Sequence, residues 1–234
     1  MWLRRERHRF FSERYTRFAL ALGLGLSLPA PLASAATDRT QSAGPWIAAA
    51  RIIKNGGQSG SGVYLRSGLV ITAAHLTDAN AKMGVHIAGL DFPAKVLKQG
   101  SLEDVDLTVL LVDEAQIPAS ITLPQMSLCE APPWPGDPVI VVDAERATQS
   151  HIVSPQVLPF GLRAKFTTLI RDVATTGNSG SGVFDPNRKC LLGIMSQKIF
   201  THTTAGDKDI AKYFVPAAAI RDFMPAEFRP PARE

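Results

Sequence analysis

A serine set among glycines, a histidine and an aspartate are the residues of this 234-residue sequence that could perform covalent chemistry together. Ser179 lies in the stretch G-N-S-G-S-G at 177–182, where glycines allow a sharp turn that directs backbone N–H groups to one point. A serine hydroxyl is a weak nucleophile until a base takes its proton. His75 ends an apolar run and could be that base, and Asp106 begins another and could orient it. The three residues predict acyl-transfer chemistry through a nucleophilic serine.

Each assignment has an alternative. Ser181 lies in the same glycine-rich stretch as Ser179, and Asp104 precedes Asp106 by two positions, on the same face of an expected strand. Taken singly, the serine stretch could be a polar turn and His75 a core histidine. The remaining histidines His86, His151 and His202 are expected to be solvated surface groups.

Three segments in a fixed order carry a family resemblance. They are T-A-A-H ending at His75, D-L-T-V-L beginning at Asp106, and G-N-S-G-S-G around Ser179, and together they resemble the chymotrypsin-like (trypsin-fold) serine proteases. G-S-G-V-Y-L at 60–65 and G-I-M-S at 193–196 resemble the strands that precede the histidine and follow the nucleophile in that family. The asparagine before Ser179 resembles the bacterial glutamyl endopeptidases and HtrA-type protease domains.

The resemblance implies a role for each residue. Ser179 would be the nucleophile, His75 the general base and then acid, and Asp106 the group that holds the imidazole tautomer. The backbone N–H groups of Gly177 and Ser179 would form the oxyanion hole.

The family's substrate pocket would be lined here by Val173, Ala174, Met195 and Lys198. Of these, Val173, Ala174 and Met195 predict an apolar pocket of medium size and cleavage after Val, Leu, Met or Ala. Asp172 in the pocket would instead favour Arg or Lys, and Lys198 there would favour Glu.

Short apolar runs separated by Gly, Asn, Asp or charged residues predict an all-β fold. The resemblance implies two antiparallel six-stranded β-barrels of the trypsin-like type, at about 46–112 and 138–215, within a protease domain over 46–226. Prolines mark 113–137 as the linker, and Pro216 with a run of alanines predicts a short C-terminal helix over 216–224. We expect no PDZ module after it. The strands of the second barrel are expected at 138–143, 163–170, 181–184, 190–196 and 210–215.

The first 35 residues resemble an export signal. They hold six arginines and two glutamates, and so they account for the whole formal net charge of +4. An apolar run at 18–28 and the small-residue pattern Ala33-Ser34-Ala35 follow, which predicts signal-peptide cleavage after Ala35 and a flexible lead-in over 36–45. The protein is therefore expected in the periplasm or outside the cell, with no membrane contact after cleavage.

The two cysteines, Cys129 and Cys190, are expected to pair in an exported protein, with two buried thiols as the alternative. The rest of the chain is neutral, which indicates no nucleic-acid partner, and no metal-ligand spacing or cofactor motif is present. We expect polypeptide substrates and no cofactor. Two functions remain: an exported serine endopeptidase, or an inactive binding or scaffold protein on the protease fold.

Overall fold

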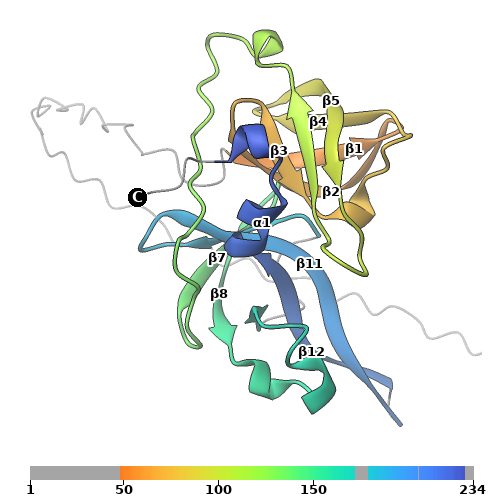
Figure 1. Cartoon of the computed structure of the whole chain (residues 1–234), viewed down its shortest axis with the longest axis vertical. Coiled ribbons are helices and arrows are strands. Elements are labelled where there is room, and N and C mark those ends of the chain that lie inside the picture. The colour runs from red at the N-terminus through yellow and green to blue at the C-terminus, as the bar shows by residue number, and fades with distance from the viewer. Residues whose placement is uncertain (1–47, 172–178, 205, 230–234) are drawn as a thin grey trace, which may run out of the picture. The chain divides into compact units, whose positions relative to one another are not determined.

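Two closed β-barrels make up the part of the chain that the structure describes, residues 48–171, 179–204 and 206–229 of a computed structural model (Figure 1). Each barrel has six antiparallel strands, which confirms the predicted fold class. The first barrel, orange to yellow in Figure 1, has the strand order β1-β2-β3-β6-β5-β4. Its strands are β1 (Ala49–Lys54), β2 (Gly57–Arg66), β3 (Leu69–Thr72), β4 (Met83–Ile87), β5 (Leu90–Gln99) and β6 (Thr108–Val112).

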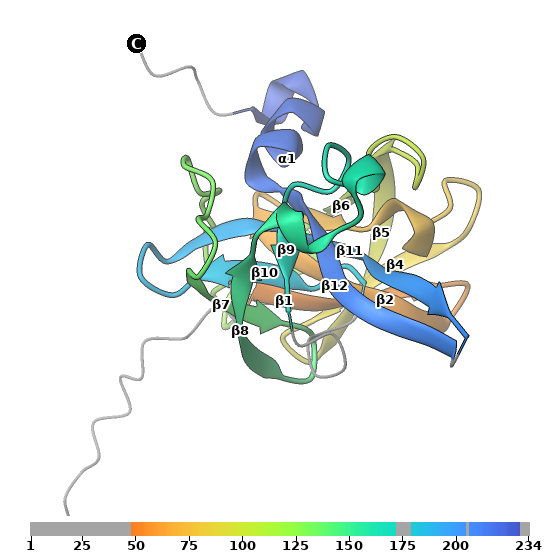
Figure 2. The same cartoon turned by 90° about the horizontal axis from the view of Figure 1, so that it is seen from below.

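The second barrel, green to blue in Figure 1, has the strand order β10-β11-β12-β9-β8-β7. Its strands are β7 (Pro138–Val142), β8 (Ala147–Val153), β9 (Leu169–Ile170), β10 (Gly182–Asp185), β11 (Cys190–Thr203) and β12 (Gly206–Pro216). Strand β9 pairs with β12 only at Lys212 and Tyr213, whereas β11 and β12 pair with each other to their far ends as a long hairpin (Figure 2).

Apolar side chains fill the barrels because the strands present them to the inside. Every residue of β3 is buried, and β4 alternates buried with half-buried residues. One buried cluster contains Leu107, beside β6, together with Phe184 of β10. The apolar core is therefore continuous from one barrel to the other, and it fixes the segments that meet at their junction.

Two segments of the second barrel differ from the prediction. Strand β8, with the sequence A-T-Q-S-H-I-V, was not predicted. Its polar residues hide the apolar alternation of a strand, because only one face is buried over most of its length. The strand predicted over 163–170 is a strand only at Leu169–Ile170. Arg163 lies instead just after a single-turn 3-10 helix (Phe160–Leu162) and donates from Nε to the Leu158 carbonyl at 2.9 Å, which curls this segment away from an extended conformation.

The linker between the barrels is fastened at both ends. It opens with a 3-10 helix (Glu114–Gln116), where Glu114 accepts a hydrogen bond of 2.6 Å from the Tyr64 hydroxyl of β2. Further along, Cys129 forms the predicted disulfide with Cys190, the first residue of β11, with the two Cα atoms 5.1 Å apart.

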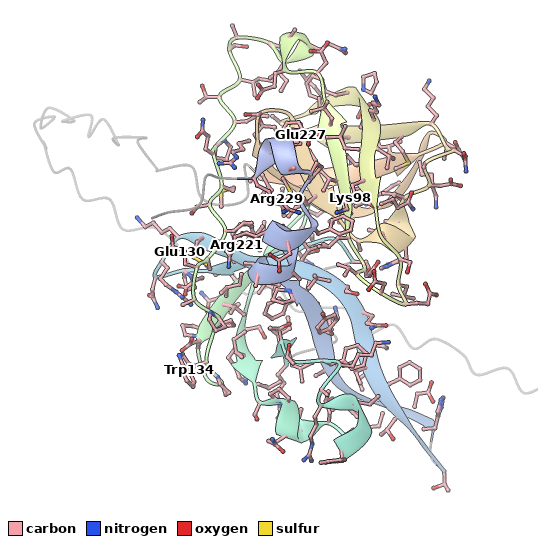
Figure 3. All side chains as sticks on the ribbon, viewed as in Figure 1. Lys98, Glu130, Trp134, Arg221, Glu227 and Arg229 are labelled. Atoms are coloured by element: carbon pink, nitrogen blue, oxygen red, sulfur yellow. A yellow bond between two sulfur atoms is a disulfide. The ribbon has the colours of Figure 1, made fainter. Side chains whose placement is uncertain are left out.

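The predicted C-terminal helix is present as α1 (Ala217–Phe223) and packs beside β11 and β12. Arg221 of this helix donates to the Cys129 carbonyl at 2.9 Å, and the Lys98 ammonium lies 4.4 Å from the centre of the Phe223 ring (Figure 3). The helix therefore contacts the linker and the first barrel as well as its own strands. The other 3-10 helices are Ala74–Leu76, Pro155–Val157 and Ala226–Phe228.

Among the residues described, no helix is both long and apolar enough to span a membrane.

Candidate active site

His75 lies on a single 3-10 turn (Ala74–Leu76) that leaves the end of β3. Ala74 and Leu76 are buried on either side of it, so the turn is anchored while the imidazole reaches the surface with 31% of its side chain exposed. Thr77 closes the turn, because its hydroxyl donates to the Ala74 carbonyl at 3.0 Å and shares a 2.8 Å hydrogen bond with Thr108 of β6. The turn that carries His75 is thereby tied to the strand that follows Asp106.

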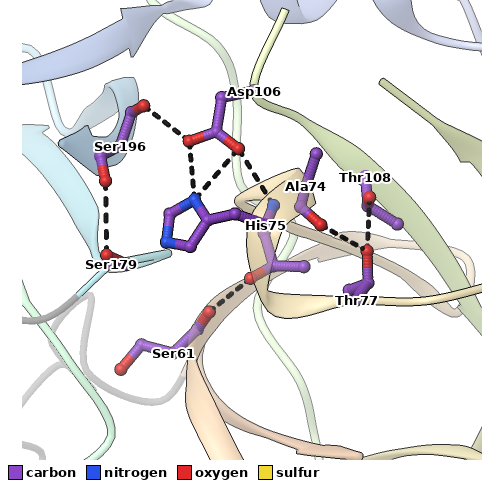
Figure 4. Close-up of polar contacts among 9 residues, drawn as sticks. Ser61, Ala74, His75, Thr77, Asp106, Thr108, Ser179 and Ser196 are labelled. Carbon is purple, nitrogen blue, oxygen red and sulfur yellow. Dashed lines mark hydrogen bonds and ion pairs between the residues drawn. The ribbon is translucent and has the colours of Figure 1, made fainter. Parts of the chain in front are cut away.

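Asp106 is 4% exposed and lies against His75 (Figure 4). Its Oδ1 accepts the His75 backbone N–H at 3.1 Å, and the imidazole Nδ1 lies 3.1 Å from Oδ1 and 2.9 Å from Oδ2. An ionised carboxylate only accepts hydrogen bonds, so the Nδ1 proton lies toward Asp106. In the neutral imidazole Nε2 then carries no proton, and this tautomer is the one that can act as a base. The alternative Asp104 is exposed, and no hydrogen bond or ion pair joins its carboxylate to His75.

Ser196 of β11 is the second donor to the Asp106 carboxylate. Its hydroxyl lies 2.6 Å from Oδ2 and is itself buried. Burial alone would raise the pKa of Asp106, but the hydrogen bonds from His75 and Ser196 outweigh it and hold that pKa below its ordinary value. The sequence prediction gave no role to Ser196. The segment G-I-M-S that contains it was interpreted only as a strand and as part of the pocket lining.

Ser179 begins the described segment 179–204, and backbone hydrogen bonds fix it and the next residue to both barrels. Its carbonyl accepts a hydrogen bond of 3.0 Å from the Ser61 N–H of β2, and the next N–H, of Gly180, donates to the Met195 carbonyl of β11 at 2.7 Å. Gly180 has a φ of +83°, and a Cβ there would lie 1.8 Å from the Ser61 carbonyl oxygen. Only glycine fits this close approach of the two barrels.

The Ser179 hydroxyl lies at the same site as His75. Its Oγ donates to the Ser196 carbonyl at 3.2 Å, and in Figure 4 it lies on the side of the imidazole that carries Nε2. Among the hydrogen bonds of the described residues none joins Ser179 to His75, so the hydroxyl must rotate from the Ser196 carbonyl to reach Nε2. Catalytic hydrogen bonds are often loose without substrate and tighten when it binds. The alternative nucleophile, Ser181, has no exposed surface.

A surface pocket opens beside His75 and Ser179. Its remaining lining comes from Leu102, from the β11 segment 195–198, and from Lys212 of β12. Of the predicted pocket residues, Met195 and Lys198 therefore line it. Lys212 was not predicted, because its place opposite Lys198 follows from strand register and not from any short motif.

Val173, Ala174 and Gly177 lie outside the described residues, and so does Asp172. Within the described part of the chain, no group of three or more His, Cys, Asp or Glu side chains could hold a metal ion.

The comparisons with known proteins agree with this geometry. The family model described as a trypsin-like peptidase domain matches residues 60–194, which is more than half of the chain. A comparison with curated proteins gave no match.

Solved structures with the same fold include serine proteases. A mutant of Rv3671c from M. tuberculosis in an inactive form has 18% identity and a TM-score of 0.55, with 76% of this chain and 85% of that chain covered. The active form of the Rv3671c protease from M. tuberculosis has 16% identity and a TM-score of 0.53, with 76% and 80% covered. A serine endoprotease from Yersinia pestis has 20% identity and a TM-score of 0.54, with 76% and 61% covered. At these identities the likeness shows the fold alone, whereas the family match shows descent: the chain belongs to the trypsin-like peptidase domain family, and it is a serine endopeptidase.

Proposed function

We propose that this endopeptidase is exported and hydrolyses peptide bonds through an acyl-enzyme on Ser179, with His75 as the base and Asp106 as its orienting group. The observation that carries the proposal is the arrangement in Figure 4, where the first barrel supplies a carboxylate-bound imidazole and the second supplies a serine hydroxyl to the same pocket. The neutral imidazole with its Nδ1 proton toward Asp106 is the state that this chemistry requires.

In the first half of the reaction, Ser179 Oγ attacks the carbonyl carbon of the scissile peptide bond and its proton passes to His75 Nε2. The tetrahedral intermediate collapses, the C–N bond breaks, and the leaving amine takes the proton from Nε2. In the second half, water attacks the ester carbonyl and gives a proton to Nε2, which returns it to Ser179. The N–H groups of Gly177 and Ser179 are proposed as the oxyanion hole, and each such donor contributes about 3 kcal/mol to transition-state stabilisation.

Asp106 acts through His75. As the imidazole takes a proton it becomes a cation next to a carboxylate that is already held ionised by Ser196. The buried pair therefore stabilises the charged imidazole at the step where it forms. Activity is expected to fall in acidic solution, where an imidazole that already carries a second proton cannot accept one from Ser179.

The test uses protein that lacks residues 1–35 and a fluorophosphonate, which reacts with activated serines. We expect labelling at Ser179, found by peptide mapping, and its loss together with peptidase activity in Ser179→Ala. Asp106→Asn should lower turnover by a factor on the order of 10⁴ because the imidazole then has the wrong tautomer. Ser181→Ala is the matched control within the same glycine-rich stretch, and it should keep the label. A folded protein that neither takes the label nor cleaves peptides would instead be an inactive scaffold on this fold.

Export is proposed from two features. Residues 1–35 have the composition of a signal peptide, and the Cys129–Cys190 disulfide is of a kind that persists in oxidising compartments. N-terminal sequencing of the protein from periplasmic and culture fractions should find a chain that begins after Ala35. Recovery of intact chain only from the cytoplasm would refute export and leave the peptidase proposal untouched.

A further inference from the structure

The hairpin of β11 and β12 extends past the other strands of its barrel (Figures 1 and 2), and its β11 strand has an open edge. Strand β10 pairs with β11 as far as Ile194, and the described backbone hydrogen bonds on that side end at Met195, whose N–H donates to the Ser181 carbonyl at 2.8 Å. From Ser196 to Thr203, β12 is the only strand that pairs with β11 among the residues described. This β11 edge is about 23 Å long, because each residue of a strand spans roughly 3.3 Å.

The backbone groups along the β11 edge point alternately to β12 and outward. Phe214 of β12 donates its N–H to the Thr168 carbonyl at 3.2 Å, on the side away from β11. The next residue, Tyr213, therefore directs its N–H and C=O toward β11, where its partner is Gln197. The register shift further along adds its extra residue to β12, so the alternation along β11 is not interrupted. The residues that direct N–H and C=O outward are then Lys198, Phe200 and His202.

The overhanging part of the hairpin is held in place by contacts of its own. Ile199 is buried in an apolar cluster with Leu158 and Phe166, which fastens β11 to the rest of the second barrel. Near the far end, His202 and Asp207 are direct partners in the ladder, and the His202 Nδ1 lies 2.6 Å from the Asp207 carboxylate. A strand that adds to this edge therefore meets a preformed partner, which lowers the entropic cost of binding.

The two strands of the hairpin differ in the residues that protect an edge from unwanted pairing. Proteins usually blunt an edge strand with charged residues or proline. The outer part of β12 carries the charged run Asp207-Lys208-Asp209, whereas β11 has the sequence I-F-T-H-T over 199–203, with neither proline nor a permanently charged residue. Isoleucine, phenylalanine and threonine also favour strands. The β11 edge is thus the one suited to receive another strand.

The β11 edge leads directly out of the active site. The Ser196 carbonyl, at its start, accepts the Ser179 hydroxyl at 3.2 Å, and Lys198 lines the pocket that contains His75 and Ser179. A substrate residue whose carbonyl is attacked by Ser179 therefore lies beside Ser196. This continuity favours the substrate chain, rather than a second copy of the protein, as the strand that covers the edge.

We propose that the part of the β11 edge beyond the pocket, residues 199–203, binds the polypeptide substrate as an added antiparallel strand. The inference rests on the proposed function, because the register is counted from the residue that Ser179 attacks. With that residue beside Ser196, the fifth residue before the scissile bond lies opposite Phe200 and the seventh lies opposite His202. The substrate class is therefore an extended polypeptide, such as an unfolded protein or a flexible segment, whose backbone groups are free to pair.

The Phe200 side chain adds a preference to this main-chain binding. It is 42% exposed, and its ring centre lies 5.2 Å from that of His202, on the same face of the strand. Side chains of directly opposite residues in an antiparallel pair lie on one face and contact each other. An apolar residue at the fifth position before the scissile bond would thus pack on the Phe200 ring.

The experiment uses fluorogenic peptides that share one cleaved sequence and have three, five, seven or nine residues before the scissile bond. We expect kcat/KM to rise about tenfold from three residues to seven, which corresponds to one or two net backbone hydrogen bonds, and to stay level from seven to nine, because the edge ends at Thr203. Extensions of equal length after the scissile bond are the control, since they do not reach this edge.

Backbone methylation of the seven-residue peptide tests the register. An N-methyl group on the fifth residue before the scissile bond should remove most of the tenfold gain, because that N–H faces Phe200. The same group on the sixth residue is the matched control and should keep the gain, because that N–H points away from the edge.

Two substitutions of Phe200 separate its backbone from its ring. Phe200→Pro removes an outward N–H, which an edge strand tolerates, and should reduce the gain from length to about threefold or less. Phe200→Ala keeps the N–H, so it should keep the response to N-methylation and lose the preference for an apolar fifth residue. Thermal unfolding checks that both variants fold, and the methylated peptides test the wild-type enzyme without any substitution.

Two results overturn the inference while the proposed function stands: a labelled wild-type enzyme whose kcat/KM is independent of the length before the scissile bond, or equal losses from methylation at the fifth and sixth residues. A stable dimer in sedimentation together with no dependence on length would show that a second copy covers the edge instead. A wild-type protein that takes no label and cleaves no peptide is the separate result that refutes the function itself.

Discussion

Removal of the Ser196 hydroxyl tests whether the Asp106 carboxylate is held ionised by the second barrel. Ser196→Ala deletes the 2.6 Å hydrogen bond to Oδ2 and leaves all three His75 contacts with the carboxylate in place. A hydrogen bond to a charged group contributes about 1.5–3 kcal/mol. We therefore expect the free energy of unfolding at pH 7 to fall by about this amount. Turnover should fall by roughly tenfold or less, because the imidazole keeps its orientation.

The loss should depend on pH in one direction. The pKa of Asp106 is lowered in the folded protein, so its interactions stabilise the fold above the ordinary aspartate pKa of about 3.9 and are lost as the pH falls through the lower folded value. The Ser196 hydroxyl belongs to those interactions. The stability difference between wild type and Ser196→Ala should thus be largest at neutral pH and shrink in acid.

Urea denaturation at pH 7 and at the lowest pH where both proteins stay folded measures this difference. Thr72→Val is the matched control, because the buried Thr72 hydroxyl donates to a neutral acceptor, the Ser61 carbonyl, at 2.6 Å. Its loss should cost about 0.5–1.5 kcal/mol at either pH. If Ser196→Ala costs the same at both pH values, its effect is one of packing and the electrostatic reasoning is refuted.

Two further substitutions test the junction and the disulfide. Gly180→Ala should lower the free energy of unfolding by roughly 2–5 kcal/mol, because its φ is +83° and the new Cβ would lie 1.8 Å from the Ser61 carbonyl oxygen. Gly136→Ala is the control and should cost about 1–2 kcal/mol, because its φ is +95° but no atom lies within 4 Å of the new Cβ. Equal losses for the two variants in thermal unfolding would contradict the role of the close approach at Gly180. Replacing both Cys129 and Cys190 by Ala should lower the free energy of unfolding by about 4 kcal/mol, since the disulfide closes a span of 61 residues. If the folded wild-type protein has two thiols that can be alkylated, the disulfide does not form.

The structure brings together the three residues that the sequence analysis singled out, although their catalytic roles stay a prediction. Each of these residues lies in a short segment in which the neighbouring residues must be small or apolar. Ala74 and Leu76 are the buried residues that anchor the turn of His75, and Gly180, next to Ser179, lets the two barrels come into contact. Such local requirements are visible in a short stretch of sequence. The fold class followed from the same segments, because they resemble a family that has one architecture.

Residues that act through strand pairing were not predictable in the same way. Lys212 reaches the pocket because β12 pairs with β11 in one register, and a shift by one residue would turn the side chain away. Ser196 reaches Asp106 from a distance of ninety positions along the chain, across the junction of the barrels. Strand β8 was missed for a related reason, since its polar face masks the alternation that marks a half-buried strand.

The division of the site between the barrels has a consequence for timing. The proposed base, His75, and its carboxylate partner, Asp106, lie in the first barrel, whereas Ser179 and Ser196 lie in the second and come later in the chain. During synthesis the N-terminal part of a chain generally folds first. On the proposed mechanism, hydrolysis would therefore become possible only when the second barrel has closed against the first and has brought Ser179 to His75.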